Sequence, residues 1–209
     1  ALLGLAYALA TLSRLDEALK LLKEAVRLAP TTAEAQVNLG NVLLRRGDEP
    51  GAEAAYREAL RVKPEFALAH HDLATLLSRR DGVDEALTHA REAVRLSPSL
   101  AAGQDLLGRL LVETDALDEA VAALALATTL DPTVPEFFDD LAAAQAAQGR
   151  FPLAVTTARL ALRKAAARGR QQLAADIRGR IAYYRSQAAS RPPPPAAGFG
   201  HAPRAPAQD

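Results

Sequence analysis

Apolar residues recur along the chain at steps of three and four positions, the spacing that gathers side chains on one side of an α-helix. Between residues 83 and 96, Arg91, Glu92 and Arg95 fall opposite the apolar positions, which are Ala86, Leu87, Ala90, Ala93, Val94 and Leu96. Gly and Pro interrupt this pattern at regular intervals. We therefore predict a succession of short amphipathic helices joined by tight turns.

The pattern repeats every 34 residues. When the chain is shifted against itself by this period, one Leu column and two Ala columns are invariant: Leu5, Leu39, Leu73, Leu107 and Leu141; Ala18, Ala52, Ala86, Ala120 and Ala154; Ala25, Ala59, Ala93, Ala127 and Ala161. A further column holds only small residues, and another holds Pro30, Pro64, Pro98 and Pro132 before Ala166. Small residues let two helices approach closely and Pro ends a helix, so each unit is predicted to be a pair of helices.

These columns resemble the tetratricopeptide repeat, most clearly in the second unit at Leu39, Gly40, Leu43, Gly47, Ala52, Tyr56, Ala59 and Pro64. The resemblance implies an all-α fold, a right-handed superhelix (solenoid) of helix-turn-helix units. It covers residues 1–168 in five units, which are residues 1–32, 33–66, 67–100, 101–134 and 135–168. The family's early Trp is replaced throughout, by Leu2, Gln36, His70, Gln104 and Phe138, which predicts looser packing between units.

A stack of amphipathic units needs a polar end, and residues 169–188 are predicted to form a capping helix. Leu173, Ile177, Ile181 and Tyr184 are expected to face the stack, whereas Arg178, Arg180 and Arg185 are expected on the solvent side. Residues 189–209 are rich in Pro with little to bury, and we expect them to stay disordered.

Composition narrows the classes of function. There is no Cys, which excludes disulfides and thiolate chemistry, and no apolar run approaches the length of a membrane span, so we expect a soluble chain with no membrane segment. In the predicted register Ala1 falls inside a helix, which indicates that further sequence precedes it.

No catalytic arrangement emerges from the residues. Asp139 and Asp140 are adjacent, as are Asp118 and Glu119, and neighbours on a helix do not converge; the latter pair fits the preference for acids at helix starts. Four His residues show no metal-ligand spacing, and no phosphate-binding loop or nucleophile motif is present. We predict a protein that is not an enzyme and needs no metal or cofactor.

Charge is uneven along the chain. Residues 159–209 carry ten Lys and Arg against two Asp and Glu, whereas residues 1–158 carry fifteen against twenty-three. The basic segment could attract nucleic acid or anionic lipid, but only Tyr183 and Tyr184 are available there for base stacking, so a solvated cap is the favoured interpretation.

The resemblance implies a concave groove lined by the first helix of each unit. Its predicted lining residues are Asn38, Asn41, Arg45, His71, Asp72, Thr75, Arg79, Asp105, Arg109, Glu113 and Asp139. Some family members clamp a peptide carboxylate with Lys and Asn; Asn41 is kept here, but Val37 and Asp72 replace other clamp residues, so we expect no clamp.

The mixture of donors, acceptors and charges suits an extended peptide or a helix of a protein partner, and a protein-binding scaffold is the main hypothesis. The alternative is that the repeats recruit or regulate substrates for a larger enzyme or membrane protein, for example a glycosyltransferase. Of the Asn ladder carried by family members that are sugar transferases, only Asn38 is present. The oligomeric state and the partner's identity are not predicted.

Overall fold

The computed structural model describes residues 2–80 and 82–190, and these contain eleven α-helices. Their bounds are α1 (Leu2–Thr11), α2 (Leu15–Leu28), α3 (Ala33–Arg45), α4 (Glu49–Val62), α5 (Ala67–Leu77), α6 (Val83–Leu96), α7 (Ala101–Glu113), α8 (Leu117–Leu130), α9 (Pro135–Ala147), α10 (Phe151–Ala167) and α11 (Gln171–Ser190). The predicted tail falls outside the described residues from position 191 onward. Within the described part, none of the helices combines the length and apolarity that crossing a bilayer requires.

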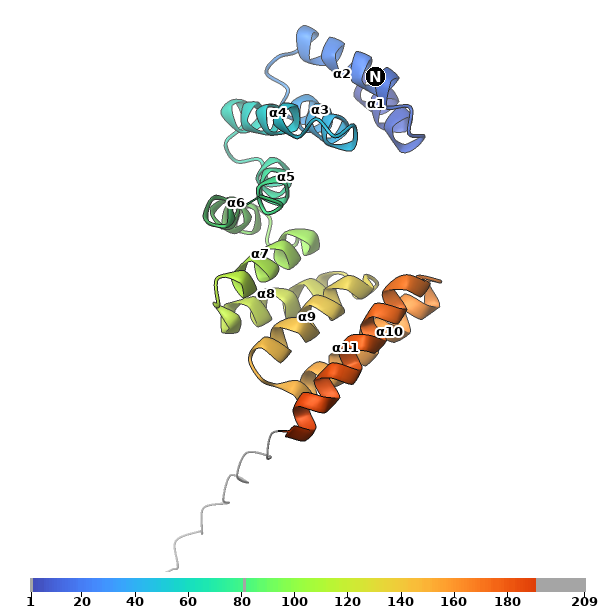
Figure 1. Cartoon of the computed structure of the whole chain (residues 1–209). Helices are drawn as coiled ribbons and strands as arrows, with labels where there is room; N and C mark the ends of the chain where they lie inside the picture. The colour runs from blue at the N-terminus through green and yellow to red at the C-terminus, as the bar shows by residue number, and fades with distance from the viewer. Residues whose placement is uncertain (1, 81, 191–209) are drawn as a thin grey trace, which may run out of the picture.

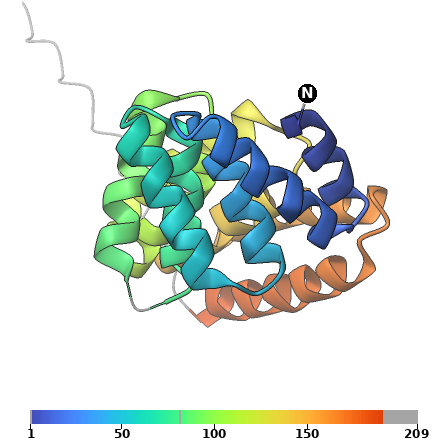
Figure 2. The same ribbon diagram turned by 90° about the horizontal axis from the view of Figure 1, so that it is seen from above.

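The helices form successive antiparallel pairs that stack along an arc (Figure 1). The first helices α1, α3 and α5 lie on the inside of the arc, and the second helices α2, α4 and α6 lie on the outside (Figure 1). Successive pairs are also rotated, since α5 and α6 are seen end-on where α10 and α11 are seen along their length. In the view from above, the blue α1 lies on the opposite side from the green α6, so the pairs do not stack in a straight column (Figure 2). This arrangement confirms the predicted helical solenoid.

Small residues allow the two helices of each pair to approach closely. A Cβ added at Gly40 would lie 2.4 Å from Cε1 of Tyr56, and one added at Gly108 would lie 2.4 Å from Cγ of Leu124. The first of the two invariant Ala columns on the second helices is fully buried, at Ala18, Ala52, Ala86, Ala120 and Ala154. Helix-helix contact through the smallest side chains therefore explains why these columns show so clearly in the sequence.

The turns of the first, second, fourth and fifth units have a common backbone conformation. Positive φ values occur at Ser13, Gly47, Asp115 and Gly149, which are related by the 34-residue period or twice that period. Gly adopts this left-handed conformation without strain, and Asp and Ser adopt it at a modest cost. The turn thus fixes the same reversal of direction in each of these units.

Polar residues take the place of the family's Trp in the second, third and fourth units, and those of the third and fourth units bond the segment that precedes them. The His70 Nε2 lies 2.9 Å from the Pro64 carbonyl, and the Gln104 side chain donates to the Pro98 carbonyl over 3.1 Å. In the fifth unit Lys164 donates to the Pro132 carbonyl and lies 4.7 Å above the Phe138 ring. These bonds satisfy carbonyl groups at helix ends, where no backbone donor is available.

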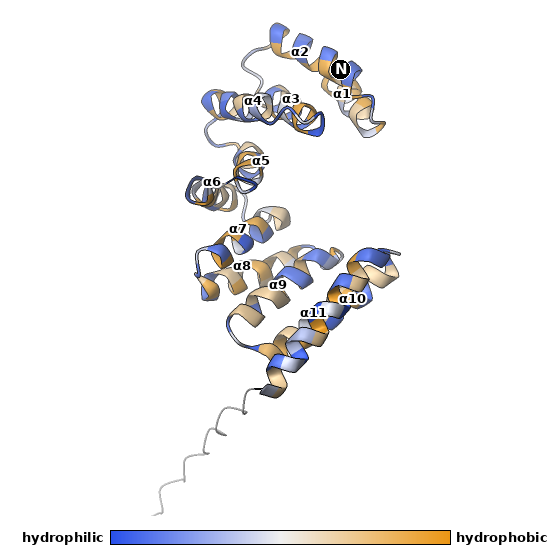
Figure 3. Cartoon of the chain, viewed as in Figure 1, coloured by the Kyte–Doolittle hydropathy of each residue, from blue (hydrophilic) through white to orange (hydrophobic). Residues whose placement is uncertain are grey.

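Ion pairs join neighbouring units along the outer surface. Arg57 of α4 bonds Glu85 of α6 over 2.8 Å, and Arg91 of α6 bonds Glu119 of α8, with Nη2 2.9 Å from Oε2. Both pairs span 28 positions. The hydropathy colouring shows α4 and α6 as mostly hydrophilic on their visible sides, while apolar colour gathers where helices meet (Figure 3). Glu85 and Glu119 lie in the first turns of α6 and α8, where negative charge stabilises a helix. The same two residues therefore also connect neighbouring units.

The last helix, α11, packs against α10 through Ile177, Ile181 and Tyr184, which are buried, with Leu173 partly buried beside them. Arg178 and Arg185 are exposed. The expectation that Arg180 faces solvent is wrong, because its guanidinium reaches back to the Asp139 carboxylate on α9.

Candidate functional site

The predicted groove residues lie on the first helices of the second to fifth units. Asn38, Asn41 and Arg45 are on α3; His71, Asp72, Thr75 and Arg79 are on α5 or directly after it; Asp105, Arg109 and Glu113 are on α7; and Asp139 is on α9. The structure brings together some of these side chains across units, while Arg79 and Glu113 are exposed and make no ion pair within the described residues.

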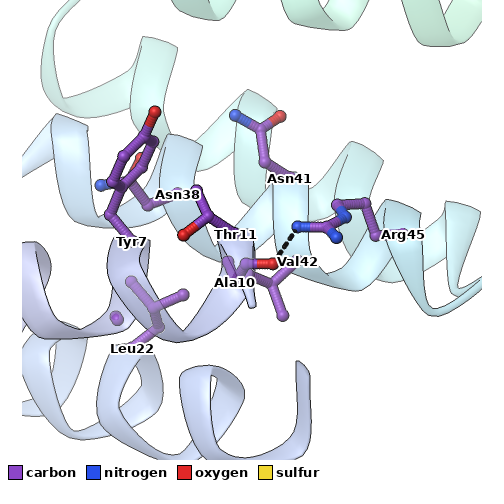
Figure 4. A pocket seen from close by; sticks show the side chains of 9 residues that line it. Tyr7, Ala10, Thr11, Leu22, Asn38, Asn41, Val42 and Arg45 are labelled. Atoms are coloured by element: carbon purple, nitrogen blue, oxygen red, sulfur yellow. Dashed lines mark hydrogen bonds between the residues drawn. The ribbon is translucent and has the colours of Figure 1, made fainter. Parts of the chain in front are cut away.

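A pocket of about 140 Å³ opens between α1, α2 and α3 (Figure 4). Its floor is apolar and is made by Ala6, Ala10, Leu22 and Val42, and its rim carries Tyr7, Thr11, Asn38, Asn41 and Arg45. Figure 4 shows the rim side chains coming from both α1 and α3. A pocket of this size, with an apolar floor and amide groups at its edge, suits one aliphatic side chain and the backbone beside it.

Arg45 closes one end of this pocket. Its guanidinium donates to the Ala10 carbonyl near the end of α1 over 2.6 Å, drawn as the dashed line in Figure 4. Cations stabilise the carbonyl end of a helix. Arg45 therefore bonds the first unit and is at the same time exposed on the inner surface.

Asn41 and Asp72 connect the second and third units. The Tyr56 hydroxyl donates to Asn41 Oδ1 over 2.6 Å. Burial raises the pKa of Asp72 to about 6, and a hydrogen bond from Asn41 partly opposes that rise. Burial also raises the pKa of Tyr56, and the nearby Asp72 charge adds to the effect, so the phenol stays protonated as a donor.

His71 and Thr75 are half-buried on α5. Thr75 donates its hydroxyl to the His71 carbonyl over 2.9 Å, and His71 Nδ1 is buried without a hydrogen-bond partner among the described residues. Burial lowers the pKa of His71, and the Arg109 charge lowers it further, so the ring is neutral at pH 7.

Two carboxylates and one guanidinium meet between α7 and α9. Arg109 Nε lies 3.2 Å from Asp105 Oδ2 and 3.9 Å from Asp140 Oδ2. Burial and the Asp105 charge raise the pKa of Asp140 to about 7, and burial also raises the pKa of Asp105. One arginine is thus shared by two acids, and at neutral pH the pair holds part of a proton.

One unit further along, Asp139 is matched by a single arginine. Arg180 Nε donates to Asp139 Oδ1 over 2.9 Å, and Nη2 bonds Oδ2. Burial raises the pKa of Asp139, and this ion pair opposes the rise. The predicted groove residue Asp139 is therefore occupied by the chain's own last helix.

Sequence reasoning missed Tyr7, Thr11 and Asp140, although the 34-residue register contained the signal. Tyr7 corresponds to Asn41 and Thr11 to Arg45, one unit earlier, and Asp140 stands at the position of Asn38 and Asp72. Extending each predicted column through all five units would have identified them. Tyr56 and Arg180 belong to other helices, and the groove columns carry no sign of them.

The structure pairs two histidines that sequence spacing separates. His70 on α5 and His89 on α6 face each other with their Nδ1 atoms 2.8 Å apart. The Pro64 carbonyl can only accept, so His70 Nε2 carries a proton, and a neutral His70 then accepts from His89 Nδ1. In the described part of the chain no three His, Asp or Glu residues are grouped to hold a metal ion.

Several side chains of the basic segment are engaged within the protein. Arg170 pairs with Glu136, Arg180 pairs with Asp139, and Lys164 bonds the Pro132 carbonyl. Tyr184 is buried, which leaves Tyr183 as the more exposed ring of the adjacent pair. These three cations and Tyr184 therefore contribute to the packing of the last helices.

Stacked helical hairpins of one length around a concave inner surface define an α-solenoid repeat protein. A family model described as tetratricopeptide repeat matches residues 3–67 and 71–135, and the chain belongs to this family. No curated protein shows significant sequence similarity to it.

Solved structures share the fold. YrrB, described as a TPR protein with an unusual peptide-binding site, is 23% identical, with 85% of this chain and 90% of YrrB covered and a TM-score of 0.66. TTC0263 of Thermus thermophilus is 24% identical over 88% of this chain and 96% of its own, with a TM-score of 0.64. PilW, described as a widely conserved type IV pilus biogenesis factor, is 17% identical over 86% of this chain and 90% of its own, with a TM-score of 0.70.

Proposed function

We propose that this chain is a protein-binding scaffold that holds an extended segment of a partner along the inner surface formed by α1, α3, α5, α7 and α9. The observation that carries the proposal is the pocket between α1 and α3, whose apolar floor is rimmed by Asn38, Asn41 and Arg45. An extended segment presents alternate side chains to such pockets and leaves backbone amides for the rim groups.

The remainder of the inner surface supports the same function. Arg79 and Glu113 are exposed, and Asp72 and Asp140 are acidic groups of the inner helices that lie close to neighbouring units. YrrB, which shares the fold, is described as having a peptide-binding site. Binding of this kind needs neither a metal nor a cofactor, and no catalytic step is proposed.

The structure also decides which residues should be used to test the proposal. Arg45 bonds α1, and Arg109 joins Asp105 to Asp140, so replacing either one disturbs contacts between units as well as the surface. Thr75 and Thr88 are better suited, because they match in their hydrogen bonds, although Thr75 is half-buried and Thr88 is exposed. Each donates its hydroxyl over 2.9 Å to a carbonyl four residues earlier, but Thr75 is on the inner helix α5 and Thr88 is on the outer helix α6.

A photo-crosslinking amino acid is introduced at Thr75 or at Thr88, and the whole chain is irradiated in a lysate of the cells that produce it. We expect a discrete crosslinked protein from the Thr75 variant that is absent from the Thr88 variant. Equal labelling from both positions, or labelling only from Thr88, would refute binding on the inner surface.

A further inference from the structure

The acidic groups of the inner surface outnumber the cations placed beside them. Asp105 and Asp140 share Arg109, Asp139 has Arg180, and Asp72 has a hydrogen bond from Asn41 but no ion pair within the described residues. Arg79 lies near enough to Tyr56 to lower the pKa of its hydroxyl, yet it makes no ion pair within the described residues. Four acids therefore stand against three arginines between α5 and α9, and the proton shared by Asp105 and Asp140 makes up part of the difference.

Asp105 shows that this excess is not simply solvated. Its side chain is only 10% exposed and its Oδ1 is buried without a hydrogen bond from an N–H group of the described residues, so the hydrogen bond that Asp105 forms with Asp140 depends on a proton held by Asp140. The neighbouring Asp140 side chain is 32% exposed. Asp105 is therefore buried, whereas Asp140 is accessible to a ligand. A buried carboxylate without its full set of donors destabilises the folded protein unless a proton or a positive charge compensates it, and a ligand cation would replace the proton that the pair now shares.

The chain itself shows the kind of group that fits. Asp139 lies one repeat period after Asp105, and there the carboxylate is bound by the guanidinium of Arg180 through two bonds. At Asp105 and Asp140 the same chemistry is incomplete, because one guanidinium serves two carboxylates.

We infer that Asp140, backed by Asp105, receives a Lys or Arg side chain of the extended partner segment, so that the groove selects basic segments. This inference rests on the proposed function and specifies the partner's chemistry. The ligand's cation would contact the exposed oxygen of Asp140, complete the charge balance with Arg109 and leave the ion pair of Arg180 in place.

The test uses the whole chain and a phage-displayed library of random dodecapeptides. Recovered peptides are synthesised, and their affinities are measured by fluorescence anisotropy for the wild type, Asp140→Asn and the control Asp84→Asn, which removes an exposed carboxylate from the outer helix α6. Each peptide is also made with its Lys or Arg replaced by Gln.

We expect the recovered peptides to be rich in Lys and Arg. Asp140→Asn and the Gln replacement should each weaken binding by about tenfold, and together they should weaken it little more than either alone, because both remove one ion pair. Asp84→Asn should bind like the wild type.

Peptides that bind the inner surface without a basic residue, or whose affinity is unaffected by Asp140→Asn, would overturn the inference while leaving the proposed function intact. The crosslink from a benzoylphenylalanine at Thr75 to the bound peptide identifies inner-surface binding in that case. Recovery of no peptide, or of peptides that crosslink only from Thr88, would overturn both.

Discussion

Arg180 on the last helix forms an ion pair with Asp139 on α9, in which Nε donates to Oδ1 over 2.9 Å. The Asp139 side chain is 11% exposed, so its carboxylate depends on this partner. The contact makes α11 part of the inner surface as well as the end of the stack.

Replacing Arg180 by Gln should therefore lower the free energy of unfolding by about 1–3 kcal/mol, because a buried carboxylate loses its cation. Urea denaturation followed by circular dichroism measures the change. Arg185→Gln removes an exposed cation from the same helix and should change stability by less than about 0.5 kcal/mol. Adding Asp139→Asn to Arg180→Gln should recover most of the loss; a double variant as unstable as the single one would contradict this explanation.

Gly108→Ala should destabilise the fourth unit. The new methyl group would lie 2.4 Å from Leu124 Cγ and 3.1 Å from the Ala120 carbonyl, and overpacking of this kind costs about 1–3 kcal/mol. Gly179→Ala is the matched control, since nothing lies within 4 Å of its added Cβ, and the gain in helix propensity should stabilise α11 by up to about 1 kcal/mol. Thermal unfolding of both variants should give shifts of opposite sign.

Asp140 should titrate near neutral pH. Its pKa of about 7 results from burial and the Asp105 charge, so Asp105→Asn should move the midpoint toward the ordinary value of 3.8. The carboxyl carbon signal in an NMR titration reports this directly. A midpoint that stays in place in Asp105→Asn would show that the two carboxylates do not interact.

The same shift predicts an effect on stability. Because the pKa of Asp140 is higher in the folded than in the unfolded chain, its contribution is present below pH 4 and is lost as the pH rises through 7. Asp140→Asn should be more stable than the wild type at pH 8, by on the order of 2 kcal/mol, and this difference should shrink on acidification. Chemical denaturation at pH 5 and pH 8 measures both values.

His89 should act in the opposite direction. Burial and then the His70 charge lower its pKa below 6.5, so the stability that a neutral His89 contributes is present above pH 6.5 and is lost as the pH falls through its folded value. Lowering the pH from 7.5 to 5.5 should destabilise the wild type more than His89→Gln, whose amide can still donate to His70 Nδ1. Identical pH dependence in the two proteins, compared by thermal melting, would count against the role of this pair.

The sequence predicts the fold well because the repeated columns hold the small residues at which two helix backbones come into close contact. Ala52 and Gly40 are small for the same reason in each unit, and one period of 34 therefore reveals the stack. The inner surface is predicted less completely. Asp140 could have been found by register, but the link from Arg180 to Asp139 depends on how α11 continues past the last full unit, and that helix does not follow the columns.

The pairing of His70 with His89 also escaped prediction, because it depends on the distance between two helices of one pair and on ring orientation. Apolar periodicity specifies which side of a helix is buried but does not specify which polar atoms meet at its edge. Internal partners for Arg45 and Arg109 were missed for the same reason.

Asn41 with Asp72 and Arg109 with Asp140 are both separated by 31 positions, and each pair joins one unit to the next. Each such contact is therefore complete within two adjacent units and requires nothing from the rest of the stack. A block of two adjacent units would therefore keep these contacts if it were moved into a longer or shorter array. In such an array, the order of the blocks would determine the order of the side chains that a bound partner segment needs.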